Sequence, residues 1–203
     1  MLKKFEAMGY DQHSVSQWVL EACSGNEASF NRLMDTFYKS IFRMIFYRIQ
    51  SQMDAEDITQ EVFLQAFNHL GTLQSPDRFK SWLFQIALNK VRDFFRKKRL
   101  RSLFQALPEK MDVEDERSEM HHHPEALENL EKADFWKVVN SLLTKLSSKE
   151  REVFTMRFLD HLSIREISNV MNKRESTIKT FLYRAMVKIK KDPSFQTLMR
   201  ETL

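Results

Sequence analysis

The chain has 203 residues and a formal net charge of +4, which suits one or two compact domains. It contains only 3 glycines and 4 prolines, so helix breakers are nearly absent and an all-α fold is expected. The single cysteine, Cys23, excludes an internal disulfide, fits a cytoplasmic location, and is predicted to be a buried structural thiol. No apolar run is long enough to cross a membrane, and the N-terminus lacks the apolar core of a signal peptide.

Charge is distributed unevenly along the chain. Residues 90–101 hold seven cations and one acid, whereas residues 109–131 hold nine acids and two cations. Such segregation indicates that the basic segments contact nucleic acid, with an acidic segment between them.

The N-terminal quarter predicts a loose tail followed by helices. Residues 1–12 resemble a tail, and a short amphipathic helix is expected from Ser14 to Ala22, ended by Gly25 and Asn26. A long apolar stripe from Phe30 to Ile49 then predicts one or two helices packed on a core.

A helix is predicted over residues 54–70, with Asp54 as its N-cap. Its buried stripe is expected to comprise Ile58, Val62, Ala66, Phe67 and Leu70. Asp57, Gln60, Glu61 and Leu64 fall on another face, which is either simply solvated or a binding surface. No histidine joins these carboxylates at ligand spacing, so neither a catalytic nor a metal site is expected there.

A polar loop over residues 71–78 precedes a second long helix, 79–98. Trp82, Ile86, Ala87, Val91 and Phe94 are expected to face the core. The remaining face is basic and includes Lys80, Asn89, Lys90, Arg92, Arg96, Lys97 and Arg99. Such a face is either a solvated helix end or a surface that follows a phosphate backbone and captures unstacked bases.

Residues 102–133 predict a flexible acidic linker, because they are highly charged and show almost no hydrophobic periodicity before Pro124. From its residues alone, the linker is expected to be a solvated tether. His121–His123 lie inside it, but three adjacent histidines in a loop lack the fixed geometry of a metal site.

The C-terminal segment 146–191 predicts a helix-turn-helix. Ser147 with Glu150, and Ser163 with Glu166, have capping-box spacing, and Asn172 suits a left-handed turn before the last helix. The non-core positions of that helix carry hydroxyls and cations, the groups that contact phosphates and base edges: Ser176, Thr177, Lys179, Thr180, Tyr183, Arg184 and Lys188. A solvated face on an ordinary helical hairpin is the alternative.

Three motifs in this order resemble a known family. The chain resembles the sigma-70 superfamily of bacterial RNA polymerase sigma factors, in the extracytoplasmic-function (ECF) group. The resemblance rests on the motifs DAEDITQEVFLQAF, FKSWLFQIALNKVRDFFRKKR, and LSSKEREVFTMRF with LSIREIS and STIKTFLYRA. The resemblance implies two helical domains, sigma region 2 at 26–101 and region 4 at 134–191. They are flanked by an N-terminal tail and short helix at 1–25, the linker at 102–133, and a C-terminal tail at 192–203. For the linker, the resemblance implies an alternative to a solvated tether: it would run through the RNA exit path of the polymerase, where its negative charge would mimic RNA.

The resemblance also implies roles for matching positions. The face with Asp54, Asp57, Gln60, Glu61 and Leu64 would dock on the clamp helices of the largest core polymerase subunit. The loop 71–78 would hold a flipped-out base, and the −10 element would meet Lys80, Asn89, Lys90, Arg92, Arg96 and Lys97. The −35 element would meet the last helix through Ser176, Thr177, Lys179, Thr180, Tyr183 and Arg184.

The chain departs from the family pattern near the helix-turn-helix. Asn172 stands where the family usually has glycine, Arg174 lies near its usual serine, and Asp160-His161 replaces Glu-Gly. The last helix therefore lacks the usual serine cap, unless Ser176 caps a helix that starts later. These changes put the −35 sequence preference in doubt.

The expected function is promoter recognition by a non-enzymatic factor without cofactors or a small-molecule substrate. Its partners would be core RNA polymerase, promoter DNA and an anti-sigma factor, in the cytoplasm. Two alternatives remain: a stand-alone helix-turn-helix regulator, which leaves residues 54–98 unexplained, and a sigma-like adaptor that binds only proteins.

Overall fold

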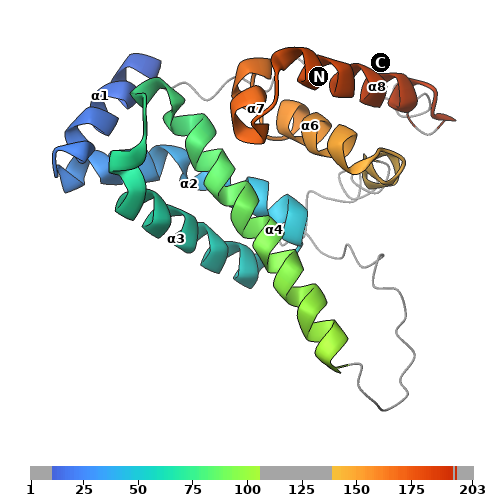
Figure 1. The fold of residues 1–203 in the computed structure, drawn as a ribbon, viewed down its shortest axis with the longest axis horizontal. Coiled ribbons are helices and arrows are strands. Elements are labelled where there is room, and N and C mark those ends of the chain that lie inside the picture. Colours follow the sequence, from blue (N-terminus) through green and yellow to red (C-terminus); the bar gives the residue numbers. More distant parts are fainter. Residues whose placement is uncertain (1–10, 106–138, 194, 196–203) are drawn as a thin grey trace, which may run out of the picture. The chain divides into compact units, whose positions relative to one another are not determined.

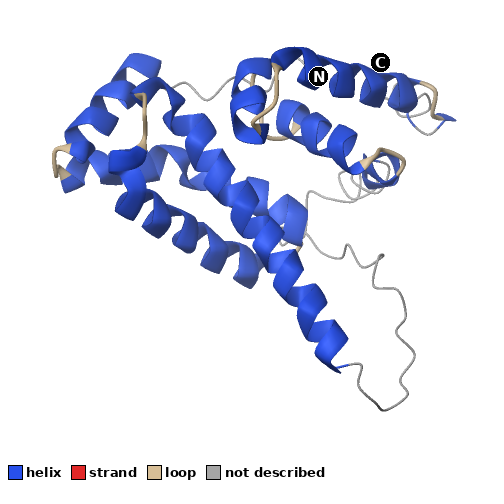
Figure 2. Ribbon diagram, viewed as in Figure 1, coloured by secondary structure: helices blue, strands red, loops and turns tan. Residues whose placement is uncertain are grey.

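The computed structural model describes residues 11–105, 139–193 and 195, which divide between an N-terminal and a C-terminal compact unit. Every regular element of the described residues is a helix (Figure 2). The prediction of an all-α protein with two helical domains is therefore confirmed. Of the predicted tails at 1–12 and 192–203, residues 1–10, 194 and 196–203 lie outside the described residues, as do the linker from 106 onward and His121–His123. Residue 12, predicted to belong to the N-terminal tail, is instead the first residue of a helix. Among the described helices, none combines the length and the apolarity needed to span a membrane.

The first helix of the N-terminal unit is α1, Gln12–Cys23 (Figure 1). The Asp11 carboxylate caps it by accepting hydrogen bonds from the backbone N–H groups of His13 and Ser14. Gly25, at φ +92°, then reverses the chain in a conformation that favours glycine, and the Asn26 side chain caps the next helix.

That next helix is α2, Glu27–Ile49, so the long apolar stripe forms one helix rather than two. Leu33, Phe37, Ile41, Met44 and Ile45 are all buried along it. Gln50 ends α2 in the left-handed conformation, and Ser51 begins the next helix directly afterwards.

Helix α3 spans Gln52–His69, and its cap differs from the predicted one. Ser51 is the N-cap, because its Oγ accepts a hydrogen bond from the Asp54 backbone N–H at 3.4 Å. Asp54 instead lies in the first turn, where its negative charge favours the helix dipole. Phe67, predicted to be buried, is 49% exposed and contacts Phe30 only through a ring edge.

Two 3-10 turns, η1 (Leu70–Thr72) and η2 (Pro76–Arg78), lead into α4, Phe79–Gln105. Helix α4 therefore includes residues 102–105, which were predicted to be the start of the linker. Its first half packs into the core of the unit through Phe79, Leu83, Phe84 and Ala87. Its second half is exposed from Phe95 to Ser102.

The C-terminal unit contains a helical segment at 139–144, then α6 (Ser148–Phe158), α7 (Ile164–Met171) and α8 (Glu175–Lys190). One cluster of its core joins Leu142 and Leu146 to Ala185 and Ile189. Ile167 on α7 and Ile178 on α8 are also fully buried. The core thus holds α6, α7 and α8 together as one unit.

Cys23 does not lie in the core, contrary to the prediction. It occupies the last turn of α1 and is exposed, with its Sγ 3.8 Å from the Leu70 carbonyl oxygen. The apolar pattern of α1 is real, since Val15 and Val19 are buried. However, the helix ends at Cys23, so the covered face does not extend over the thiol.

Candidate polymerase and nucleic-acid interfaces

One face of α3 carries the residues predicted to bind core polymerase. Asp57, Gln60, Glu61 and Leu64 are exposed, while Asp54 is half-buried in the first turn. Their spacing places them along one side of the helix, opposite the buried residues Ala55, Val62 and Ala66. Leu64 is 63% exposed and adds an apolar side chain to this face. The face therefore combines carboxylates with accessible apolar surface, a composition suited to another helix.

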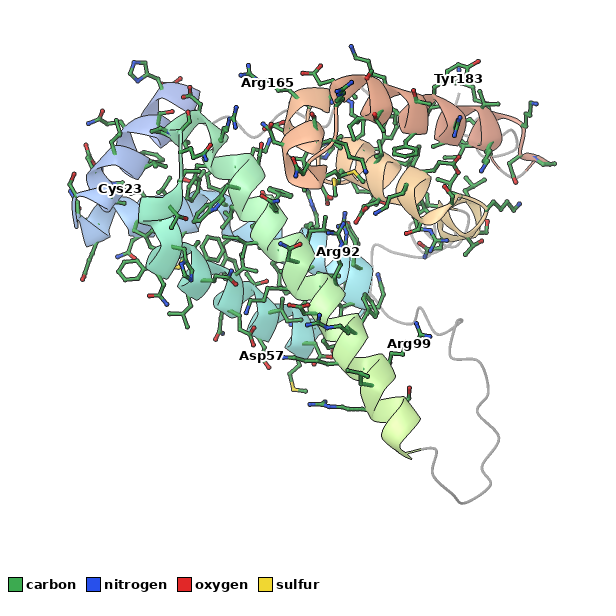
Figure 3. The ribbon with its side chains drawn as sticks, in the orientation of Figure 1. Cys23, Asp57, Arg92, Arg99, Arg165 and Tyr183 are labelled. Atoms are coloured by element: carbon green, nitrogen blue, oxygen red, sulfur yellow. The ribbon has the colours of Figure 1, made fainter. Side chains whose placement is uncertain are left out.

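The basic face of α4 carries the residues predicted for the −10 element. Asn89, Arg92, Arg96 and Lys97 are exposed, and Lys80 and Lys90 are half-buried. Arg92 and Arg99 follow one another along the helix in Figure 3. Arg92 Nη1 donates to Asn89 Oδ1 at 3.4 Å, and Arg96 Nη2 lies 3.0 Å from Asp93 Oδ1. The face is strongly cationic, but part of its charge is engaged within the helix.

Lys90 links this face to α3. Its Nζ lies 2.7 Å from Glu61 Oε2, and the two side chains are 28% and 57% exposed. The structure thus brings together one residue predicted to contact DNA and one predicted to contact polymerase. A sequence pattern cannot reveal this pair, because the two residues are 29 positions apart.

The loop 71–78 between α3 and α4 is held at both ends by local hydrogen bonds. Leu73 N donates to Leu70 O at 3.0 Å, and Arg78 N donates to Ser75 O at 3.0 Å. Thr72 at the end of η1 and Gln74 between the two turns are exposed. The loop therefore presents polar groups to solvent from a short, fixed connection.

The helix-turn-helix forms as predicted. Both capping boxes are present: Glu150 Oε2 accepts from Ser147 N at 2.9 Å, and Glu166 Oε2 accepts from Ser163 N at 2.6 Å. Asn172 adopts φ 49° and ψ 52°, the left-handed turn expected before the last helix.

His161 shows how the chain accommodates one departure from the family pattern. It stands where the family has glycine, and it adopts φ 55° in the turn before α7. The backbone conformation that favours glycine is therefore kept with a different side chain.

Helix α8 begins without a side-chain cap. Its N-cap is Arg174, which makes no capping hydrogen bond, and Glu175 is the first helical residue. Ser176 therefore lies inside the helix, and the possibility that it caps a later start is excluded.

The outer face of α8 presents the residues predicted for the −35 element. Ser176, Lys179, Thr180, Tyr183 and Arg184 are exposed, and Thr177 is half-buried beside the fully buried Ile178. Tyr183 is 71% exposed, and Figure 3 shows it on α8. The Thr180 hydroxyl donates to Ser176 O at 2.9 Å, and its oxygen lone pairs remain able to accept a hydrogen bond.

A buried carboxylate anchors α8 behind this face. Glu150 is 5% exposed, and its Oε2 lies 2.6 Å from Lys188 Nζ. The hydrogen bond from Lys188 and the backbone N–H of Ser147 hold the pKa of the Glu150 carboxyl below its ordinary value. One side chain therefore completes the cap of α6 and fixes the position of α8.

Arg165 is a candidate that the sequence pattern did not single out. It is an exposed cation at the start of α7, the first helix of the helix-turn-helix (Figure 3). In such motifs the first helix crosses the DNA backbone, so a cation there suits a phosphate contact. The signal available in the sequence was an arginine two positions after Ser163, the residue predicted to cap this helix.

No cluster of histidine, cysteine, aspartate and glutamate within the described ranges has the composition of a metal site.

Comparisons with known proteins identify the family. Residues 33–101 match the model "Sigma-70 region 2", and residues 137–189 match "Sigma-70, region 4". The chain is 36% identical over 179 residues to the ECF RNA polymerase sigma factor BldN of Streptomyces coelicolor; the match covers 87% of this chain and 64% of that protein. It is 32% identical over 144 residues to a probable RNA polymerase sigma factor of Haemophilus influenzae, covering 66% of this chain and 74% of the relative.

The fold agrees with a solved structure. The sigma factor RpoE of Bartonella quintana, crystallised with the anti-sigma factor NepR, aligns with a TM-score of 0.61 at 20% identity, covering 84% of this chain and 96% of that one. The two matched segments, the sequence relatives and the paired helical units all agree. The chain belongs to the sigma-70 family of RNA polymerase sigma factors, in its extracytoplasmic-function group.

Proposed function

We propose that this protein binds core RNA polymerase in the cytoplasm, directs it to a set of promoters, and helps to open their −10 region, without catalytic residues or cofactors of its own. The observation that carries this proposal is the presence of two distinct units in one chain: a helix-turn-helix, and a separate helical unit with its own exposed polar and basic faces. A duplex-binding regulator needs only the first.

In this proposal α3 is the polymerase-binding helix. Asp57, Gln60, Glu61 and Leu64 would contact the clamp helices of the largest subunit, with Asp54 at the edge. Exposed carboxylates flanking an exposed leucine support this assignment, because an apolar centre with a charged rim is typical of helix–helix recognition.

Promoter DNA would meet two surfaces. The α4 face with Asn89, Arg92, Arg96 and Lys97, together with Lys80 and Lys90, would follow the −10 strand while the loop 71–78 captures an unstacked base. Helix α8 would read the −35 duplex through Lys179, Arg184 and their hydroxyl-bearing neighbours Ser176, Thr177, Thr180 and Tyr183, with Arg165 on a phosphate.

The predicted domain limits are part of the proposal. Region 2 would occupy residues 26–101 and region 4 residues 134–191, with 1–25, 102–133 and 192–203 as flanking and linking segments. An anti-sigma factor is the further partner we propose; RpoE of Bartonella quintana was solved with one.

Promoter binding with and without core polymerase tests this function. The free protein should show weak, nonspecific DNA binding, whereas the holoenzyme should select promoter fragments from a random library and produce run-off transcripts from them. Tight operator binding by the free protein would favour a stand-alone regulator. Transcription that stays at background with core enzyme and the library would favour a protein-binding adaptor.

A further inference from the structure

Helix α1 precedes the segment matched to sigma region 2, which begins at residue 33, and none of the roles proposed above uses it. Nevertheless α1 packs against α2, η1 and η2. Figure 1 shows α1 beside the connection that joins α3 to α4. The helix therefore contacts the loop that is proposed to capture a base.

Two polar contacts fasten α1 to the two ends of this loop. Near the α4 end, Ser16 Oγ donates to Asp77 Oδ1 at 2.8 Å. Near the α3 end, Cys23 Sγ lies 3.8 Å from Leu70 O. Ser16 and Cys23 are seven positions apart in the sequence, so the two contacts are about two helical turns apart, roughly 10 Å along the helix axis. Val19 is buried between the two contacts, and Val15 is buried directly before Ser16, so both anchor the helix.

This arrangement fixes the ends of the loop and leaves its middle accessible. Thr72 and Gln74 are exposed between the two fastened points. A loop that must receive an unstacked base loses less conformational entropy on binding when its ends are already held by a rigid element.

We infer that α1 holds the loop 71–78 in the conformation that captures the base, and that Ser16 is a positioning residue acting through Asp77. This inference rests on the proposed function, because it specifies how the loop performs the base capture proposed there. Ser16 itself need not touch DNA; its role is to keep Asp77, and the turn that follows Ser75, in place.

Removing the hydrogen bond between Ser16 and Asp77 should have a moderate and local effect. A hydroxyl-to-carboxylate hydrogen bond at the surface contributes modestly to stability, so its removal should slow base capture by about three- to ten-fold without unfolding the unit. The initial attachment of holoenzyme to duplex DNA and the association with core polymerase use other faces and should change less than about two-fold.

The test uses holoenzyme assembled from the full chain, with promoter fragments that carry 2-aminopurine at single positions across the −10 element. Fluorescence of this base rises when it leaves the stack. Ser16→Ala should slow the rise by about three- to ten-fold at the position that responds in the wild type. Ser16→Thr and Asp77→Asn keep a donor and an acceptor respectively, so both should retain most of the wild-type rate. Ser24→Ala is the matched control, since Ser24 Oγ bonds only to Leu20 O of its own helix.

Each outcome decides the inference. The inference is supported if Ser16→Ala and Asp77→Ala each slow the fluorescence rise and the double variant is no slower than the single variants. A wild-type rate for Ser16→Ala, or a loss of core association in parallel with the slower rise, overturns it and leaves the proposed function intact. A wild-type holoenzyme that gives no rise at any position contradicts the proposed base capture, and the inference with it.

Discussion

The ion pair between Lys90 and Glu61 joins two surfaces that we assign to different partners. The Lys90 Nζ lies 2.7 Å from Glu61 Oε2, so the ammonium is paired, although the Glu61 side chain remains more than half exposed. Such a pair is worth about 0–1 kcal/mol in water, so it biases Lys90 without locking it. We therefore expect Glu61 to compete with DNA for the Lys90 ammonium.

Glu61→Gln should therefore strengthen the contact of holoenzyme with −10 DNA by up to about five-fold at low salt, since it removes the competitor for Lys90. The measurement is promoter opening at saturating core polymerase, so that weaker core association does not interfere. In a Lys90→Met background the same change should have no effect. An equal effect in both backgrounds would show that Glu61 does not act through Lys90.

Glu150 makes the helix-turn-helix sensitive to acid. Its folded-state pKa lies below the ordinary 4.5, so its stabilising contribution is complete above that pH and is lost as the pH falls through the folded-state value. The hydrogen-exchange protection factors of α6 amides in the full chain, which are corrected for the intrinsic pH dependence of exchange, should therefore fall below about pH 4.5. Glu150→Gln should flatten this dependence and destabilise the unit by about 1–3 kcal/mol at neutral pH.

The control for Glu150→Gln is Glu175→Gln, an exposed acid in the first turn of α8. It should cost less than about 1 kcal/mol, because an exposed charge near a helix terminus contributes little. Equal losses of stability in the two variants would mean that the contact of Glu150 with Lys188 stabilises the unit no more than an exposed helix-terminal charge does.

At the scale of elements, α8 begins with a defect that substitution should correct. Arg174 at the N-cap offers no acceptor, so a backbone N–H of the first turn lacks the usual side-chain partner. Arg174→Ser should stabilise the C-terminal unit by about 0.5–2 kcal/mol, measured by hydrogen exchange of the α8 amides. Arg174→Ala removes the same cation without supplying a cap and should give no gain.

Local signals identified most elements from the sequence. The capping boxes at Ser147 and Ser163 and the left-handed turn at Asn172 were predictable because their hydrogen bonds join residues within one turn. The start of α3 was missed because Ser51 and Asp54 are both good caps, and only the folded backbone shows which one accepts the hydrogen bond. Burial of Phe67 and Cys23 was predicted wrongly, since periodicity does not reveal where a covering element ends.

The sequence was enough to predict which residues make up each candidate binding face, but not which side chains of distant segments contact one another. The sequence shows which faces of α3, α4 and α8 are polar, because helical spacing alone defines a face. The contacts of Lys90 with Glu61, Ser16 with Asp77, and Lys188 with Glu150 each join distant segments. Such contacts depend on how helices pack, which no local pattern specifies.

At the scale of the whole molecule, substitutions should weaken the proposed −35 contact of α8 and the proposed polymerase contact of α3 independently of one another. Lys179→Ala with Arg184→Ala should weaken −35-dependent transcription while core association is unchanged. The salt dependence of promoter binding should also fall, by about one unit of slope for each phosphate that is no longer neutralised. Asp57→Ala with Glu61→Ala should do the opposite, lowering core association in a pull-down without unfolding the protein.

Because the two sets of residues lie in separate compact units, their effects on transcription at limiting polymerase should add within about 0.5 kcal/mol in the combined variant. Strong non-additivity would mean that the units communicate. Core association that survives Asp57→Ala with Glu61→Ala would remove α3 as the clamp-binding helix.

The link between α2 and α3 consists of two residues, Gln50 and Ser51, and its shortness has a consequence for folding during synthesis. Helices joined so tightly make contacts between residues that are close in sequence, and such contacts form quickly during folding. N-terminal domains generally fold first as a chain leaves the ribosome. The face of α3 that we propose to bind polymerase is therefore expected to fold while α8 is still being translated.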